Sequence, residues 1–183
     1  TTLFNSDEFD RMMQTITPFD LVAYSELEPF YNSVCKFLNI DRKELLITSG
    51  SDQGIKSVYE TFINESDEVI NYTPNYAMFS VYAKMFGARE VVKNYNGQLG
   101  IDIDELISSI NEATKLIVIS NPGHNGVTVP EVDIIRVLEH TRNSQTIVLV
   151  DEAYVDFSTV DMLGHINTYK NLLIVRTMSK AYG

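Results

Sequence analysis

Two polar turns near the end of the chain carry side chains that could do chemistry together. The apolar run 146–150 ends in Asp151 and Tyr154, and the apolar run 172–175 leads into a turn that holds Lys180. In open α/β sheets ligands bind at the carboxyl ends of the strands, so both turns should face one site. An amine that can form a Schiff base, a carboxylate that can hold a pyridinium and a nearby phenol are what pyridoxal phosphate chemistry requires.

Each of these side chains also has an ordinary interpretation. Asp151 could cap a helix, and Lys180 could be a solvated surface lysine. However, an aspartate at the end of an apolar strand is costly unless it is paired, and a protonated pyridine nitrogen would be such a partner. A lysine must lose its proton before it attacks an aldehyde, and a cationic cofactor with exclusion of water would lower its pKa.

Three earlier loops add groups that suit the same ligand. Residues 48–54 combine a tight turn at Gly50 with a helix start, whose free N–H groups suit a phosphate, although a plain helix cap looks the same. Tyr76 could stack on a flat ring or pack on the core. Loop 121–128 offers Asn side chains that can donate to a phenolate oxygen, and His124 could bind or simply be solvated. The occurrence of all four loops in order favours a common site.

Strands and helices must alternate to position these loops. Apolar periodicity predicts strands at 44–48, 68–72, 89–93 and 115–120 and two more ending at 151 and 176, and helices at 26–37, about 52–62, 76–86, 102–111 and 130–142. This alternation predicts an α/β fold, a three-layer α/β/α arrangement with a mostly parallel sheet and right-handed crossovers. Residues 1–24 are poorly patterned and polar, and we interpret them as an arm before a domain at 25–183.

Composition excludes several classes of function. The 183 residues are 44% apolar and 21% charged with a net charge of −11, so nucleic acid is an unexpected partner. No Gly-x-Gly-x-x-Gly or Walker pattern occurs, and no run approaches the ~20 apolar residues of a membrane span. Cys35 alone can form neither an internal disulfide nor a metal cluster, so we expect a core thiol, no metal site and a cytoplasmic location.

The chain resembles the large domain of fold type I pyridoxal phosphate enzymes, and among them the histidinol-phosphate aminotransferase group. The matching stretches are Gly-Ser-Asp-Gln-Gly-Ile at 50–55, Pro-Asn-Tyr-Ala-Met-Phe-Ser at 74–80, Asp-Glu-Ala-Tyr-Val-Asp-Phe at 151–157 and Arg-Thr-Met-Ser-Lys-Ala-Tyr at 176–182. They run in family order from about residue 20 to the end. Asp-Glu-Ala-Tyr followed by a strand and Ser-Lys-Ala is the specific part of this resemblance.

The resemblance implies roles around the cofactor ring. Lys180 would hold pyridoxal 5'-phosphate covalently and later move the substrate proton. Asp151 would pair with the pyridine nitrogen, Tyr154 would hydrogen-bond the phenolic oxygen, and Tyr76 would stack on the ring.

It also implies a phosphate site and an assembly. Backbone amides of Ser51 and Asp52 or Gln53, with the Ser179 hydroxyl, would hold the phosphate. Tyr24 matches a tyrosine that reaches the phosphate in the neighbouring subunit, which implies a homodimer.

Two departures from the family pattern are visible. The loop that reads Asn-Pro-Asn-Asn-Pro-Thr-Gly in the family is Asn-Pro-Gly-His-Asn-Gly at 121–126, one residue shorter. Asn125 would preserve the ring-binding amide, with His124 as the alternative. In addition, the chain ends at Gly183, before the small domain of the family, so we expect that the protein is longer or that this is a truncated piece.

The sequence therefore predicts an aminotransferase that moves an amino group between an amino acid and a keto compound. Histidinol phosphate or a similar small phosphorylated compound is the substrate that the resemblance favours. The alternatives are a decarboxylase or lyase using the same cofactor on a phosphorylated amino acid, and a non-catalytic dimerisation remnant.

Overall fold

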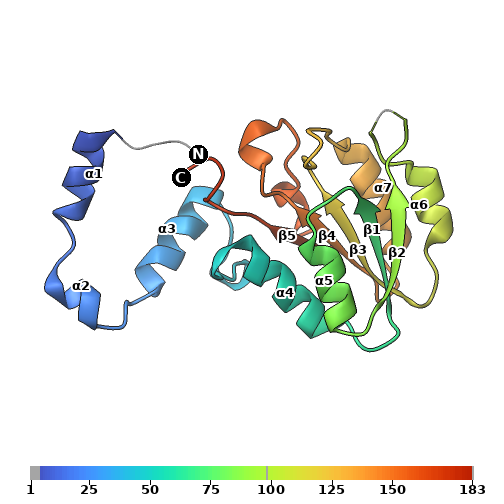
Figure 1. The fold of residues 1–183 in the computed structure, drawn as a ribbon, viewed down its shortest axis with the longest axis horizontal. Coiled ribbons are helices and arrows are strands. Elements are labelled where there is room, and N and C mark those ends of the chain that lie inside the picture. Colours follow the sequence, from blue (N-terminus) through green and yellow to red (C-terminus); the bar gives the residue numbers. More distant parts are fainter. Residues whose placement is uncertain (1–4, 98, 183) are drawn as a thin grey trace.

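A five-stranded sheet forms the centre of the computed structural model, which describes residues 5–97 and 99–182 (Figure 1). Its strands are β1 (Glu68–Thr73), β2 (Arg89–Asn94), β3 (Thr114–Ser120), β4 (Ile147–Asp151) and β5 (Leu172–Val175). They lie in the order β2-β1-β3-β4-β5, and every neighbouring pair is parallel. The five corresponding strand predictions are confirmed.

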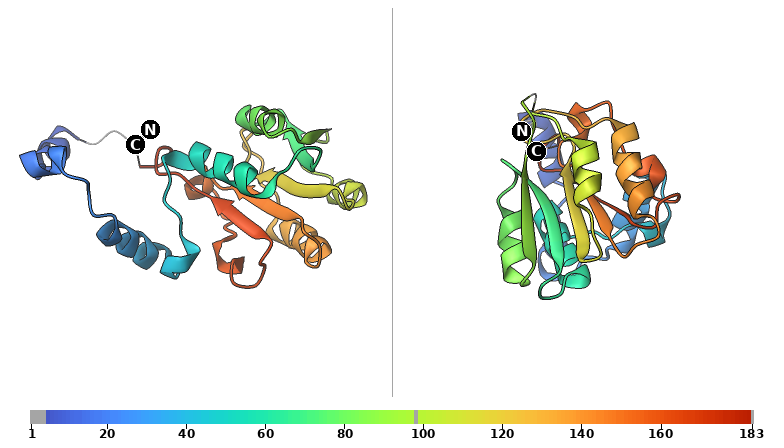
Figure 2. Two further views of the ribbon diagram at one scale, coloured as in Figure 1. Left: turned by 90° about the horizontal axis from the view of Figure 1, so that it is seen from below. Right: turned by 90° about the vertical axis from the view of Figure 1, so that its right-hand side faces the viewer.

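Helices cover both faces of this sheet. The α-helices are α1 (Ser6–Met13), α2 (Pro18–Val22), α3 (Glu28–Leu38), α4 (Gly50–Phe62), α5 (Met78–Met85), α6 (Ile103–Ser109) and α7 (Glu131–Thr141). Short 3-10 turns are η1 (Arg42–Glu44), η2 (Val155–Phe157) and η3 (Leu163–His165). Figure 2 shows α4 and α5 on one face and α6 and α7 on the other. The predicted three-layer α/β/α fold is confirmed.

Alternation of side chains along the strands divides the core into two layers. In β3, Leu116 and Val118 pack with α4 and α5, whereas Ile117 and Ile119 pack with α6 and α7, and all four are fully buried. Successive side chains of a strand point to opposite faces, so a strand with both faces covered must be apolar throughout. The apolar run that predicted this strand has that physical origin.

The direction of the strands places four loops at one edge of the sheet. The carboxyl ends of β1, β3, β4 and β5 are Thr73, Ser120, Asp151 and Val175, and Ser120 lies in register with Asp151. The order of the strands reverses between β1 and β3, because β2 lies on the far side of β1. Open α/β sheets bind ligands at such a reversal, outside the carboxyl ends.

The predicted strand at 44–48 is wrong. Residues 45–48 form no strand, because β5 pairs only with β4 among the described residues and no neighbouring strand accepts this segment. Leu46 is 71% exposed, and the Ile47 N–H donates to the Tyr31 hydroxyl at 3.0 Å instead. A short apolar run becomes a strand only when another strand supplies its hydrogen bonds.

The prediction of an unpatterned, polar arm is wrong in part. Residues 1–4 lie outside the described part, but the rest contains α1 and α2, which extend away from the sheet (Figures 1 and 2). The Asn5 side chain caps α1, and Thr17 with Asp20 forms a capping box on α2. Apolar side chains along this segment are exposed, including Phe19 (73%) and Leu21 (77%).

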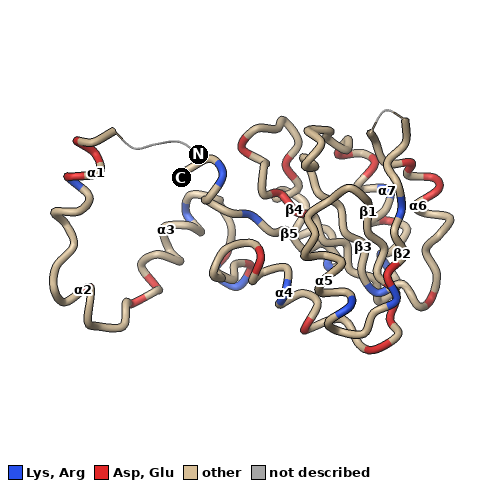
Figure 3. Tube along the Cα trace, in the orientation of Figure 1, with Lys and Arg blue, Asp and Glu red and all other residues tan. Residues whose placement is uncertain are grey.

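Charge and hydropathy add two findings. Lys and Arg are scattered along the trace between more numerous acidic residues (Figure 3), consistent with the net charge of −11. Within residues 5–97 and 99–182, no helix is long and apolar enough to cross a membrane, and no group of three or more His, Cys, Asp and Glu could hold a metal ion. Cys35 is buried, as predicted.

Candidate active site

Five polar or aromatic side chains meet beyond the carboxyl ends of the strands. The Lys180 Nζ lies 5.4 Å from the centre of the Tyr154 ring. The His124 ring lies 5.6 Å from the Tyr154 ring and 6.2 Å from the Tyr76 ring, measured between centroids. Charges on His124 and Lys180 both act on the Asp151 carboxylate. The structure thus brings together Lys180, Asp151, Tyr154 and Tyr76, which the sequence analysis selected, and adds His124, which it gave as an alternative to Asn125.

Asp151 is a buried acid at the last position of β4. Only 6% of the residue is exposed, and its carboxylate accepts a hydrogen bond from the Ala153 N–H at 3.1 Å. Burial raises the pKa of Asp151, and the Ala153 N–H and the charges of His124 and Lys180 offset part of that rise. A cation placed against this carboxylate would be strongly favoured.

The turn that carries Lys180 is tied to the turn that carries Asp151. The Glu152 N–H donates to the Val175 carbonyl at 2.8 Å, and the Glu152 carboxylate accepts from the Arg176 Nε at 2.8 Å. Glu152 is only 1% exposed. The sequence argument missed this ion pair, although a second acid after an apolar strand and an arginine after the next strand were visible signals.

Tyr76 is held in place by the first turn of α4. Its hydroxyl donates to Asp52 Oδ1 at 3.1 Å, and the Tyr82 hydroxyl donates to Asp52 Oδ2 at 2.8 Å. Burial, and next the hydrogen bond to Asp52, raises the pKa of Tyr82 to about 12 and also raises the pKa of Tyr76. The Asp52 side chain therefore orients Tyr76. Its backbone N–H lies in the first turn of α4, where it has no partner within the helix.

The amino end of α4 has the form of an anion site. Gly50 has a φ of +78°, a conformation that glycine adopts without strain, and the Ser49 side chain makes no capping bond. Ser51, Asp52 and Gln53 follow in the first turn, where backbone N–H groups have no partner within the helix. These are the backbone amides that the family resemblance implied as the phosphate site.

Gly54 sets how closely α4 approaches β5. A Cβ added there would lie 2.8 Å from the Val175 Cγ1 and 3.4 Å from the Thr48 Oγ1. We expect Gly54→Ala to lower the free energy of unfolding by about 1–3 kcal/mol through overpacking, partly offset by about 1 kcal/mol of helix propensity. Urea denaturation measures this, with Gly164→Ala as the control because nothing lies within 4 Å of its added Cβ. Equal stability of the two variants would contradict this account.

Hydrogen bonds within the loop between β3 and α7, and one to residue 99 in another loop, fix its conformation. The buried Asn121 side chain bonds both the N–H (2.8 Å) and the carbonyl (3.2 Å) of Val129. Asn125 donates from Nδ2 to the Leu99 carbonyl at 3.2 Å and accepts from the Val127 N–H at 3.0 Å. Its amide is therefore engaged with neighbouring backbone in this structure.

Two further residues from the sequence analysis are not part of the central group: Tyr24 lies apart from it, and Ser179 lies at its margin. Tyr24 follows α2 and is fully exposed, on the segment that extends away from the sheet (Figure 1). The Ser179 hydroxyl shares a 2.9 Å hydrogen bond with the Thr177 hydroxyl in the turn before Lys180. One chain thus brings the Ser179 turn to the site but leaves Tyr24 outside it.

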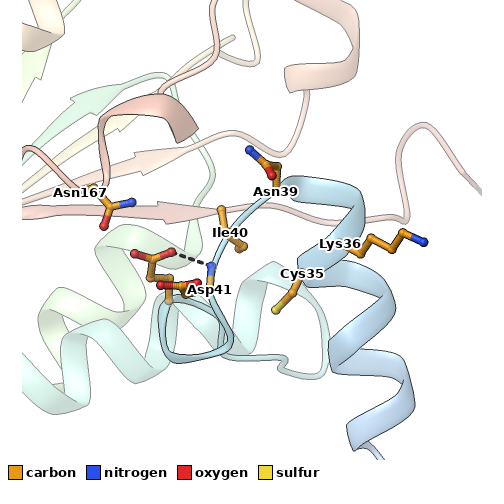
Figure 4. Close-up of a pocket in the computed structure, with 7 residues that line it drawn as sticks. Cys35, Lys36, Asn39, Ile40, Asp41 and Asn167 are labelled. Carbon is orange, nitrogen blue, oxygen red and sulfur yellow. Dashed lines mark hydrogen bonds between the residues drawn. The ribbon is translucent and has the colours of Figure 1, made fainter.

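A separate groove of about 350 Å³ lies between the end of α3 and the segment after it (Figure 4). Its lining residues are Cys35, Lys36, Asn39, Ile40, Asp41, Glu44 and Asn167. The Glu44 carboxylate there accepts from the Asp41 N–H at 2.8 Å, which is the capping bond of η1. None of the residues of the central group lines this groove, so it is distinct from the candidate active site.

Comparison with known proteins agrees with this geometry. The family model for aminotransferase class I and II matches residues 17–183. The chain belongs to this family. The matched range contains every residue discussed above as part of the site.

Relatives and solved structures extend the comparison. A histidinol-phosphate aminotransferase of Clostridium novyi is 33% identical over 149 residues, which are 80% of this chain and 41% of that protein. The solved histidinol-phosphate aminotransferase of Clostridium acetobutylicum superposes with a TM-score of 0.79 at 22% identity, covering 95% of this chain and 51% of that one. The L-threonine-O-3-phosphate decarboxylase of Porphyromonas gingivalis gives 0.71 at 21% identity, covering 85% and 47%. The chain thus spans about half the length of the proteins that it matches.

Proposed function

We propose that the protein is a pyridoxal 5'-phosphate-dependent aminotransferase. The observation that carries this proposal is the buried carboxylate of Asp151 beside the amine of Lys180, with Tyr154 next to both. Family membership supports the same reaction class, and so does the likeness of the fold to that of a PLP-dependent aminotransferase from Streptococcus suis.

The residues present fit this cofactor. Among residues 5–97 and 99–182 the buried Asp151 carboxylate has no charged hydrogen-bond partner, so a pyridinium would compensate it. Tyr154 offers a phenol, and the first turn of α4 offers backbone N–H groups for a phosphate. Each part of the cofactor therefore has a chemically matched group.

The bound cofactor would act as an electron sink for the substrate carbanion. Asp151 would keep a proton on the ring nitrogen, and Tyr154 would hydrogen-bond the phenolic oxygen. The Lys180 amine would remove the proton from the substrate Cα and deliver it to the C4′ carbon of the cofactor, which requires the neutral amine. Amides of Ser51 and Asp52 or Gln53, with the Ser179 hydroxyl, would bind the phosphate.

The proposed substrate is histidinol phosphate or a similar small phosphorylated amino compound. This rests on relatives named histidinol-phosphate aminotransferase, which are 28–36% identical to this chain. An amino donor should convert the protein-bound pyridoxal phosphate to pyridoxamine phosphate, which chromatography of the released cofactor detects. Decarboxylation of a phosphorylated amino acid is the second candidate, since one structure with this fold carries that name. Carbon dioxide release without pyridoxamine phosphate would favour it.

We also propose that the protein is a homodimer in which the segment around α1 and α2 packs on a second copy. Its apolar side chains, such as Phe19 and Leu21, are exposed and need a cover. Tyr24 lies on the same segment and would reach the phosphate of the partner.

Replacing Phe19 and Leu21 together by serine should shift the protein from dimer to monomer. The reason is that two large apolar side chains would no longer be buried between subunits, at about 1.5–3 kcal/mol each. Sedimentation velocity measures the change. Phe157→Ser is the matched control, because Phe157 is 68% exposed on the opposite part of the chain, and it should leave the dimer intact. A dimer of unchanged affinity in the double variant would exclude this role for the segment.

A further inference from the structure

The loop between β3 and α7 contains two side chains able to donate a hydrogen bond to a ligand, His124 and Asn125. The family pattern has an amide at the ring, which favours Asn125 by residue type. The structure allows a choice by geometry, since the two side chains have different surroundings.

Asn125 is folded back on its own loop. Its Nδ2 donates to the Leu99 carbonyl at 3.2 Å, and its Oδ1 accepts from the Val127 N–H at 3.0 Å. The same Oδ1 lies only 2.8 Å from the place that a Cβ on Gly123 would occupy. One N–H of the amide and its oxygen are thus used to shape the turn, and reorienting the side chain toward a ligand would break these two bonds.

His124 faces the other groups of the site. Its ring meets the Tyr154 ring edge to face, with 5.6 Å between centroids and 82° between planes, and lies 6.2 Å from the Tyr76 ring. The charged groups around it are Asp151, whose pKa responds to the presence of His124, and Lys180, whose Nζ lies 5.4 Å from the centre of the same Tyr154 ring. These neighbours come from three separate loops.

We propose that His124 is the residue of this loop that contacts the ring of the bound cofactor and donates a hydrogen bond to its phenolic oxygen. The inference rests on the proposed function. A neutral imidazole carries one N–H, so the donor that an amide would supply is retained. An imidazole also differs from an amide in shape and donor strength, so the identity of the residue at this position sets the environment of the phenolic oxygen.

The test uses the purified protein freed of cofactor and titrated with pyridoxal phosphate. His124→Ala removes the donor and should raise the dissociation constant at least about tenfold, whereas His124→Asn keeps a donor and should stay within about threefold. Asn125→Asp is the matched control, because it keeps the acceptor for the Val127 N–H but removes the amide donor. It should also stay within about threefold.

A second readout separates a contact with the ring from a structural role. In His124→Asn the pH midpoint of the visible absorbance of the bound cofactor should shift by about half a pH unit or more, because a different donor then faces the phenolic oxygen. Near-UV circular dichroism of the cofactor-free variants checks that they fold alike.

Two results would overturn the inference. One is that Asn125→Asp loses affinity while His124→Ala retains it, and the other is that His124→Asn leaves the pH midpoint unchanged. Failure of the proposed function looks different, because the unaltered protein would then bind no pyridoxal phosphate at Lys180 at all.

Discussion

Replacing Lys180 by alanine should abolish amino transfer, with a loss of at least about a thousandfold. The variant lacks the amine that, in the function we propose, attaches the cofactor and moves the substrate proton. Pyridoxal phosphate should still bind through Asp151 and the first turn of α4, but borohydride reduction should leave no covalently modified peptide. Mass spectrometry of the reduced, digested protein measures this directly.

Two variants sharpen the Lys180 test. Lys180→Arg keeps a positive charge but stays protonated, so it should fail as completely as alanine. Lys170→Ala removes an exposed lysine on the segment before β5 and should behave as the unaltered protein. Covalent labelling at a lysine other than Lys180 would remove the basis of the proposed site.

Replacing Asp151 by asparagine should have two effects of opposite sign. Activity should fall about a hundredfold or more, because the ring nitrogen loses the charge that stabilises its protonated form. The cofactor-free protein should become more stable at neutral pH by about 1–3 kcal/mol, because a buried charge that is only partly compensated is removed. Enzyme assays and urea denaturation of the cofactor-free protein measure the two effects.

The sign of the stability effect follows from the pKa of Asp151. Burial raises this pKa in the folded state above the value in the unfolded chain. The favourable contribution of the protonated acid is therefore complete below the ordinary pKa of aspartate and is lost as the pH rises through the raised pKa. The gain from asparagine should shrink when the pH is lowered through that range.

Asp156→Asn is the control for this pair of effects, since Asp156 is exposed a few residues further along the same loop and asparagine keeps an oxygen that can accept from the Tyr182 hydroxyl. It should change neither activity nor stability appreciably. Lower stability of the Asp151→Asn protein without cofactor would show that the carboxylate serves the fold and not a ligand.

Much of the architecture could be predicted from the sequence, because a strand that is buried on both faces must be apolar at every position. The continuous apolar run at 115–120 requires a central strand, and the polar residues that end such runs mark the edge where loops meet. The proximity of Asp151, Tyr154 and Lys180 follows from that rule together with the parallel pairing of β4 and β5. These features could be predicted because they depend on residues that are close together in the sequence.

The rest depends on contacts between distant segments. The segment 44–48 has the composition of a strand, but strand formation depends on a neighbour that the sequence does not specify. Whether His124 or Asn125 faces the ligand depends on the Leu99 carbonyl, which accepts the Asn125 amide. Leu99 itself has a φ of +62°, a conformation that the sequence does not reveal. The ion pair between Glu152 and Arg176 likewise joins the segments that follow β4 and β5. Such partners become visible only when the chain is folded.

The buried carboxylate at the end of β4 has a consequence for the life of the protein in a cell. Without a cation against Asp151, burial of this carboxylate lowers the stability of the fold, and we expect the molecule to open more often. Ligand binding removes that penalty and lowers the population that proteases can attack. We therefore expect the abundance of the protein to follow the supply of vitamin B6, with newly made molecules degraded faster when it is scarce.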